Sequence, residues 1–174
     1  MIPRTSALLV ALAFAGLTLA APAEEEAKKY AADLKHKDAK VRLEAAKELG
    51  RLGGAKKSLV APYLDDILAA MKDKDAAVRG EAAKTLGIVD PPDKKAAVKA
   101  VADALKGEKS EAARAGMETG LGELGAMADE DAEAKKMARD ALLEARKKYT
   151  ESKREQKVIQ AALILINGPK KKKN

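Results

Sequence analysis

A seventeen-residue pattern occurs twice in the chain, and this repetition constrains the fold more than any other feature. Residues 34–50 read LKHKDAKVRLEAAKELG and residues 71–87 read MKDKDAAVRGEAAKTLG, so the two align without gaps at an offset of 37 residues. A fixed period of this length is typical of repeat architectures built from small supersecondary units. A weaker third copy ends at Leu121-Gly122, and a fourth unit is inferred over residues 130–167. We therefore expect about four units.

Each unit is predicted to contain two helices. The apolar residues between Leu64 and Met71 recur at helical spacing, which predicts a first helix from about Ser58 to Lys72. Asp75 is expected to cap the second helix, and Gly87 is expected to end it. Because no segment shows a strand pattern, the fold class is predicted to be all-α.

Two other segments carry the signals of helix starts. Asp90-Pro91-Pro92-Asp93 combines capping carboxylates with prolines suited to the first helical positions. Ser152 and Glu155 have the spacing of a capping box, in which each side chain satisfies a backbone N–H of the other residue.

The core of such units must be built without aromatic rings, because Phe, Trp and Tyr make up only 2% of the chain. The alanine pairs Ala45-Ala46 and Ala82-Ala83 recur at the same place in two units. Small side chains let neighbouring helices approach closely. One helix pair cannot bury its apolar stripe alone, but stacked pairs share a continuous core.

The run L-x-D-x-D-x-x-V-R-x-x-A-A-x-x-L-G resembles a HEAT repeat, and residues 68–87 are close to that consensus. The resemblance extends over most of residues 24–168. It implies a right-handed α-solenoid of about four antiparallel helix pairs, with the second helices lining a concave face. It also implies a ladder between adjacent units, formed by the Asp and Arg of the motif. The residues carried over are Asp38, Arg42, Asp75, Arg79 and Arg114.

The first 23 residues are predicted to be a secretory signal peptide. Arg4 precedes an apolar run over residues 7–20, and Ala21-Pro22-Ala23 offers small residues at a cleavage site. The run is short for a membrane span, which takes about 20 residues. We therefore expect an exported protein, periplasmic or extracellular, with no transmembrane segment after processing. An uncleaved membrane anchor is the alternative.

The net charge of +7 is concentrated at the C-terminus. Residues 169–174, which follow the helix stop Gly168-Pro169, are predicted to form a disordered tail. Without the signal peptide and this tail, the remaining body is nearly neutral. The tail is either simply solvated or weakly attracted to anionic polymers of the cell envelope. Its cations are Lys170, Lys171, Lys172 and Lys173.

No residue is predicted to act in catalysis or to bind a metal ion or cofactor. The chain has no Cys, and its single His36 lies in a loop between two lysines, without a nucleophile or second base nearby in the sequence. Residues 129–133 alternate carboxylates but lack the Gly and distal Glu of a calcium loop. They are expected to begin a helix.

Nucleic acid is not an expected partner, because the three tyrosines are spread over different units and form no stacking platform. The tyrosines are expected to pack. The last helix, by contrast, is unusually apolar from Val158 to Ile166. Leu163 and Ile164 lie on either side of its narrow polar strip, which predicts an apolar interface for a partner or a second copy. Coverage by the helix over residues 134–149 is the alternative.

The sequence is most consistent with a non-catalytic protein-binding or scaffolding module that acts outside the cytoplasm through its concave face. Glu44, Lys47, Glu81 and Lys84 are expected to project from that face. They either contribute to polar recognition of a protein partner or form an ordinary solvated surface. One alternative is a surface-associated structural protein that binds anionic polymers through the lysine tail. A HEAT-like lyase is a further alternative, but the chain lacks the nucleophile or acid–base pair it needs.

Overall fold

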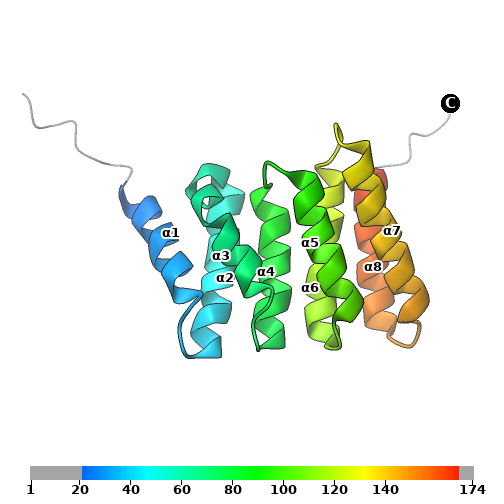
Figure 1. The fold of residues 1–174 in the computed structure, drawn as a ribbon, viewed down its shortest axis with the longest axis horizontal. Helices are drawn as coiled ribbons and strands as arrows, with labels where there is room; N and C mark the ends of the chain where they lie inside the picture. The colour runs from blue at the N-terminus through cyan, green and yellow to red at the C-terminus, as the bar shows by residue number, and fades with distance from the viewer. Residues whose placement is uncertain (1–20, 169–174) are drawn as a thin grey trace, which may run out of the picture.

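The computed structural model describes residues 21–168, which form a row of stacked helix pairs (Figure 1). No strand occurs within this range. The predicted all-α solenoid is confirmed. The helices pair as α1/α2, α3/α4, α5/α6 and α7/α8. Their bounds are α1 Ala21–Asp33, α2 Ala39–Ala55, α3 Leu64–Ala70, α4 Ala76–Val89, α5 Lys94–Gly107, α6 Glu111–Ala126, α7 Ala132–Lys148 and α8 Lys153–Asn167, with short 3₁₀ turns η1 Lys57–Leu59 and η2 Ala61–Tyr63 before α3.

The predicted signal peptide and tail lie largely outside the described residues. Of residues 1–23, only 21–23 are described, and they belong to the first turn of α1. The tail from Lys170 to Lys173 follows the last described residue. The boundaries of the signal peptide and of the tail therefore stay predictions.

The second helix of each unit begins at a side-chain cap, which gives the four units a common register. Asp75 Oδ1 accepts hydrogen bonds from the backbone N–H groups of Ala77 and Val78, at 2.9 and 3.2 Å, which confirms it as the cap of α4. Such a bond satisfies backbone donors that have no partner within the helix. The corresponding caps of α2, α6 and α8 are Asp38, Ser110 and Ser152.

The first helix of the second unit differs from the prediction. In place of one helix from Ser58 to Lys72, the chain forms two 3₁₀ turns and then the short helix α3. Pro62 lies inside the second 3₁₀ turn. Proline has no backbone N–H and disfavours a helical conformation in the residue before it, so the regular helix begins only after this turn.

Two predicted helix starts are also corrected. Asp93, not Asp90, caps α5, and the two prolines precede the helix. Asp90 instead ends α4 in the left-handed conformation, with a φ of 56°. At α8, Ser152 Oγ accepts from the backbone N–H of Glu155 at 3.1 Å, but the Glu155 carboxylate binds Arg114 instead of returning to Ser152.

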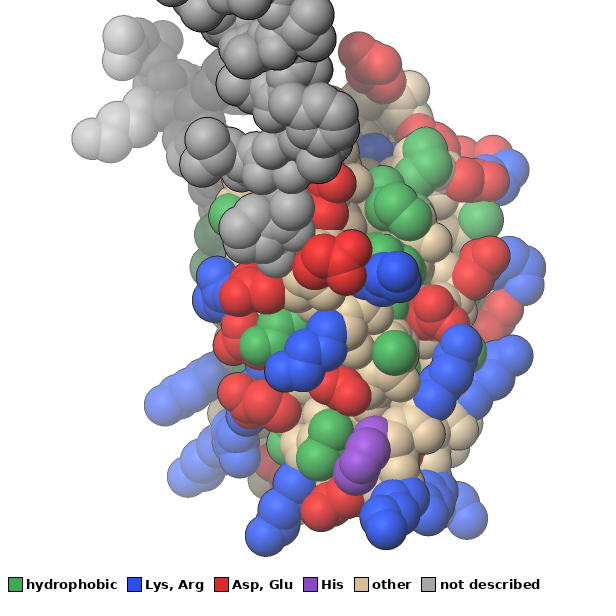
Figure 2. Space-filling view, turned by 90° about the vertical axis from the view of Figure 1, so that its left-hand side faces the viewer, with side chains coloured by type: hydrophobic (Ala, Val, Ile, Leu, Met, Phe, Trp, Pro, Cys, Tyr) green, Lys and Arg blue, Asp and Glu red, His purple; other side chains and the backbone are tan. Residues whose placement is uncertain are grey.

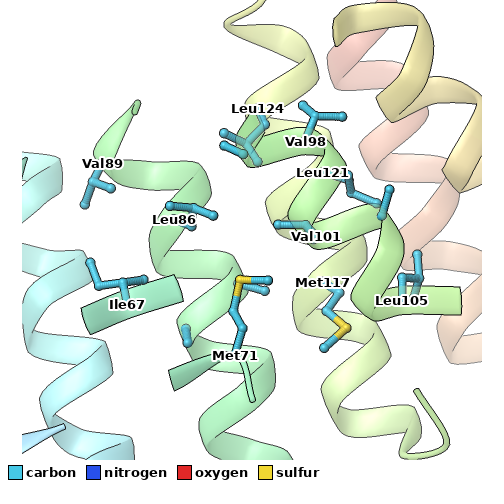
Figure 3. Packing of buried hydrophobic residues seen from close by; sticks show 14 of the residues in the cluster. Ile67, Met71, Leu86, Val89, Val98, Val101, Leu105, Met117, Leu121 and Leu124 are labelled. Carbon is cyan, nitrogen blue, oxygen red and sulfur yellow. The ribbon is translucent and has the colours of Figure 1, made fainter. Parts of the chain in front are cut away.

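A continuous aliphatic core runs through all four units. Leu49, Leu86, Leu121 and Leu163 stand eleven residues after the four caps, and all four are buried. Figure 3 shows how Leu86, Met117 and Leu121 lie between neighbouring helices in the middle of the stack. The tyrosines are only partly buried and pack against the margin of this core, as expected.

Glycines bring the second helices of the two central units into backbone contact. A Cβ atom on Gly116 of α6 would overlap the backbone of Gly80 in α4, and one on Gly120 would overlap the carbonyl oxygen of Ala83. A Cβ on Gly87 would lie 3.0 Å from the Cα of Gly120. These positions exclude any side chain larger than hydrogen without a shift of one helix.

Among the first helices, α5 packs against α7, but α3 is widely spaced from both of its neighbours. α2, α4, α6 and α8 pack against one another in succession, whereas α3 makes little contact with α1 or α5. A groove of about 730 Å³ remains between α3 and α5, with Leu68, Met71 and Ala104 in its lining. A stack whose two layers have unequal spacing must curve toward the closely packed layer. The second helices therefore form the concave side.

We expect Gly116→Ala to lower the free energy of unfolding by about 2 kcal/mol or more, because overpacking typically costs 1–3 kcal/mol. Gly107→Ala is the matched control, since it also lies in a helix but would meet nothing within 4 Å. That variant should be neutral or slightly stabilised by the higher helix propensity of alanine. Urea unfolding of both variants measures the difference. Equal stability of the two would contradict a tight α4–α6 contact.

Candidate functional site

The concave side is the broadest surface that the second helices share. The predicted residues Glu44 and Lys47 lie on α2, and Glu81 and Lys84 lie on α4. Their side chains are 62%, 49%, 18% and 44% exposed, in that order. Each lysine pairs with the glutamate of its own helix, at 3.6 Å in α2 and 3.1 Å in α4. The charges in this half of the face are therefore locally balanced.

The character of this face changes along the stack. Nine residues after each cap stand, in order, Lys47, Lys84, Thr119 and Ala161. Thirteen residues after each cap stand Arg51, Ile88, Glu123 and Leu165. The face is thus charged on α2 and becomes apolar at α8.

Of the two residues predicted to form an apolar interface on the last helix, Leu163 is buried and only Ile164 is exposed. Leu163 is only 7% exposed, because it occupies the core position shared with the leucines of the other units. Ile164 is 57% exposed, and its neighbour Leu165 is 44% exposed. Counting residues from the cap at Ser152 places Leu163 at the buried core position and Leu165 on the exposed face. The burial of Leu163 could therefore have been predicted from the sequence. The exposed apolar pair is Ile164 and Leu165, which we name the α8 patch.

The predicted arginines form a ladder between units. Arg42 donates from Nε and Nη2 to both carboxylate oxygens of Asp73, at 2.6 and 2.7 Å. Arg79 binds Glu108 in the same way, at 2.7 and 2.9 Å. Bidentate arginine–carboxylate pairs are strong and geometrically specific. Each pair joins one unit to the next.

The predicted acidic members of the ladder are wrong. Asp38 and Asp75 each cap a helix through one carboxylate oxygen, and the carboxylates that bind the arginines stand two residues before a cap, at Asp73 and Glu108. In addition to binding Arg42, Asp73 accepts a hydrogen bond from the backbone N–H of Asp75 at 2.8 Å. The motif of the second unit contains both Asp73 and Asp75. Only the structure shows that Asp75 caps the helix and that Asp73 binds the arginine.

The last link of the ladder uses a different acid. Arg114 binds Glu155 at 2.6 and 2.8 Å, and Glu155 lies in the first turn of α8 instead of the preceding loop. The ring of Tyr149 lies 4.0 Å from the Arg114 guanidinium carbon. In the fourth unit, Gln156 stands in place of the arginine, and its amide donates to the carbonyl of Tyr149 at 2.7 Å.

A second acid, Glu118, is buried beside this last link. It stands where the first two units have Ala46 and Ala83. Both of its carboxylate oxygens are buried and have no hydrogen-bond partner within the described chain, and the carboxylate of Glu155 lies nearby. Burial, and after it the negative charge of Glu155, raise the pKa of Glu118 to about 9, while the positive charge of Arg114 acts in the opposite direction. Glu118 is therefore protonated at neutral pH.

The residues considered for catalysis and metal binding are separate in space. His36 is exposed in its loop, where Nδ1 accepts from the backbone N–H of Asp38 at 3.1 Å. Asp131 caps α7, as its acidic segment predicted. Within residues 21–168, no group of three or more His, Cys, Asp or Glu side chains is placed to hold a metal ion. In the same range, no helix has the length and apolarity needed to cross a bilayer.

Replacing Glu118 with Gln should remove a pH dependence of stability. Since the pKa of Glu118 is raised in the folded protein, its contribution is fully favourable below about 4.5 and is lost as pH rises to about 9. The free energy of unfolding of the wild type should fall relative to that of Glu118→Gln across this range. Denaturant unfolding at several pH values measures it, with Glu123→Gln on the same helix as control. Parallel curves for all three proteins would refute the buried neutral acid.

The arginine ladder predicts that the free energy of unfolding rises with pH in the acidic range, which is opposite in sign to the effect of Glu118. Hydrogen bonding to Arg79 lowers the pKa of Glu108 to about 2. Its stabilising contribution is present above about 4.5 and is lost as pH falls toward 2. Glu108→Gln should therefore be less stable than the wild type at pH 7, and this difference should shrink on acidification. A constant difference from pH 7 to pH 2 would contradict the ionic link.

Comparisons with known proteins agree with this architecture. Residues 30–122 match the family model described as HEAT repeats. Two crystal structures of engineered proteins share the fold: one has 18% identity and a TM-score of 0.56 over 81% of this chain, the other 20% identity and a TM-score of 0.53 over 82%. The matches span 62% and 38% of those proteins, so this chain covers less than two thirds of either. No curated protein sequence matches. The family match, the stacked helix pairs and the arginine ladder together show that the chain belongs to the HEAT repeat family.

Proposed function

We propose that this protein is an exported, non-catalytic module that binds a protein partner on its concave face. HEAT repeats in general serve in protein binding and scaffolding. The observation that carries the proposal is the α8 patch, where two large aliphatic side chains are exposed next to the apolar end of that face. The location outside the cytoplasm rests on the signal-peptide pattern of residues 1–23.

The two halves of the face contribute differently to binding. Burial of the α8 patch supplies affinity, since apolar surface removed from water contributes roughly 25 cal/mol per Å². The ion pair on α2 is exposed and that on α4 is half-buried, and pairs in contact with solvent contribute only about 0–1 kcal/mol each. They can therefore exchange partners at little cost. In that arrangement, the charged half of the face determines which partner binds, and the apolar half supplies most of the binding free energy.

The lysine tail supports a second, separable proposal. Lys170–Lys173 follow the last described residue and carry four positive charges, so they would attract anionic polymers of the cell envelope. Such attraction is screened by salt, whereas burial of the α8 patch is not. Salt dependence therefore distinguishes the two modes.

The test uses chemical cross-linking in the exporting cell, followed by binding measurements with the purified partner. We expect Ile164→Ser/Leu165→Ser to weaken binding to that partner by at least tenfold. Leu143→Ser is the control, because Leu143 is 38% exposed but lies on α7 in the other layer. Circular dichroism should show the same helix content for all variants.

Two results would overturn the proposal. Binding that is insensitive to the α8 patch and to a charge exchange at Glu81 and Lys84 would place the partner elsewhere. A partner that is only a second copy of this chain would make the patch an oligomer interface.

A further inference from the structure

The two kinds of loop lie on opposite edges of the stack. The loops that join the two helices of one unit follow α1, α3, α5 and α7, and they form a row along the lower edge in Figure 1. The loops that join successive units lie along the upper edge. The α8 helix also ends at the upper edge, at Gly168.

The charges are divided between these edges, although the body as a whole is nearly neutral. Figure 2, a view of the N-terminal end, shows Lys and Arg side chains gathered toward the lower edge. We name the lower row the basic edge. Its cations, all exposed, are Lys35, Lys37, Lys40, Lys72, Lys74, Lys106, Lys109, Lys147, Lys148, Lys153 and Arg154. The upper edge carries more acids than cations. Its acids are Glu24, Glu25, Glu26, Asp90, Asp93, Asp129, Glu130, Asp131 and Glu133, and its lysines are Lys56, Lys57, Lys94, Lys95 and Lys135, of which all but Lys56 pair with one of these acids.

Several acids on the basic edge are already engaged. Asp73 and Glu108 bind the arginine ladder, and Asp38 and Asp75 cap helices, whereas Asp33, Glu111 and Glu151 lie at the same edge and take part in no ion pair with another described residue. The cations of the edge outnumber these acids. Lys35 pairs with Asp66, and Lys106 pairs with Asp103. Within residues 21–168, the remaining cations of the basic edge take part in no ion pair: Lys37, Lys40, Lys72, Lys74, Lys109, Lys147, Lys148, Lys153 and Arg154.

Helix stability explains the acidic edge but not the whole basic edge. Acids at a helix N-terminus interact favourably with its dipole, as Glu24 does in α1 and Glu133 in α7. Cations at a helix N-terminus interact unfavourably. Lys40 nevertheless lies in the first turn of α2, which contains no acid, and Lys153 begins α8. The interaction with the helix dipole therefore does not explain why Lys40 and Lys153 stand at these positions.

We propose that the basic edge binds a linear anionic polymer. Neighbouring helices lie about 10 Å apart, so the four loops present cations at intervals along a line. A polymer with repeated phosphate, sulfate or carboxylate groups fits such a row. The large exposed aliphatic residues are Leu143, Ile164 and Leu165, and none of them lies in these loops. These four loops therefore lack the exposed aliphatic anchors of a membrane-inserting surface, and the one tyrosine among them, Tyr149, is half-buried with its ring against Arg114.

The basic edge is distinct from the lysine tail and from the concave face. The tail follows Gly168, which lies at the opposite edge. The concave face consists of the sides of the second helices, whereas the basic edge consists of the loops and first turns at one end of them. A bound polymer would therefore leave the α8 patch accessible.

The test compares two triple variants that remove the same charge. Lys37, Lys74 and Lys109 each stand immediately before a cap in three successive loops and are exposed. Lys28, Lys56 and Lys95 are exposed elsewhere and serve as the control. The probe is long-chain inorganic polyphosphate, with affinity measured by calorimetry on the full chain between 50 and 200 mM salt. The caps and the ladder stay intact in both variants, and thermal unfolding checks this.

We expect K37Q/K74Q/K109Q to weaken binding at least tenfold at the lowest salt concentration. The slope of log affinity against log salt should become shallower by about 2–3, because fewer counterions are released. The control K28Q/K56Q/K95Q should lose less than threefold. Replacing Lys170–Lys173 with Gln should leave the effect of the basic-edge triple in place.

Three outcomes would overturn the proposal. Equal losses in the two triple variants would mean that only net charge matters. Loss of all binding with the tail variant alone would assign the polymer to the tail. Tighter binding to phosphatidylglycerol vesicles than to polyphosphate, abolished by the same triple, would make the edge a membrane-facing surface. If the basic-edge triple unfolds early, the three single variants replace it, and each should lose affinity.

Discussion

The backbone contact between α4 and α6 is the constraint on which the rest of the structure depends. Because Gly80, Gly116 and Gly120 have no side chains, the second helices of the central units approach more closely than the first helices. The difference in spacing curves the stack and makes one side concave. The aliphatic core then needs no aromatic filling, since small residues leave little space between the helices. A chain with 2% aromatic residues can therefore form a continuous core.

The arginine ladder fixes the units in register once the helices are in contact. Each guanidinium binds a carboxylate and the carbonyls of the loop before its own helix; Arg42, for example, reaches the carbonyls of His36 and Lys37 at 2.8 and 3.1 Å. The acid that binds Arg42 also holds the turn before the next cap. One arginine therefore orders two loops. In the fourth unit, where Gln156 stands in place of the arginine, its amide donates to the carbonyl of Arg146 in α7 and to that of Tyr149 just after it.

Much of the fold could be predicted from the sequence because it depends on local patterns. The caps at Asp38 and Asp75, the leucines of the core and the arginines all recur at fixed spacing. The acids of the ladder could not be assigned, because the loop before α4 carries two carboxylates, Asp73 and Asp75, and their roles depend on which unit stacks on them. Leu163 was misplaced for a different reason: the apolar run from Val158 hides the periodicity that the cap at Ser152 restores. The separation of charge between the two edges was also not predicted, because the net charge of a chain does not show where its charged residues lie in the fold.

The unequal spacing of the two helix layers has a mechanical consequence. Helices α4 and α6 touch through their backbones, while α3 and α5 are separated by a groove. The contact lies in the layer of second helices and the groove lies in the layer of first helices. The two units can therefore rotate relative to each other about the contact. Bending that narrows the groove straightens the stack and requires only side chains to move, whereas bending in the opposite sense compresses backbone against backbone. The junction between the second and third units should therefore bend more easily in one direction than in the other.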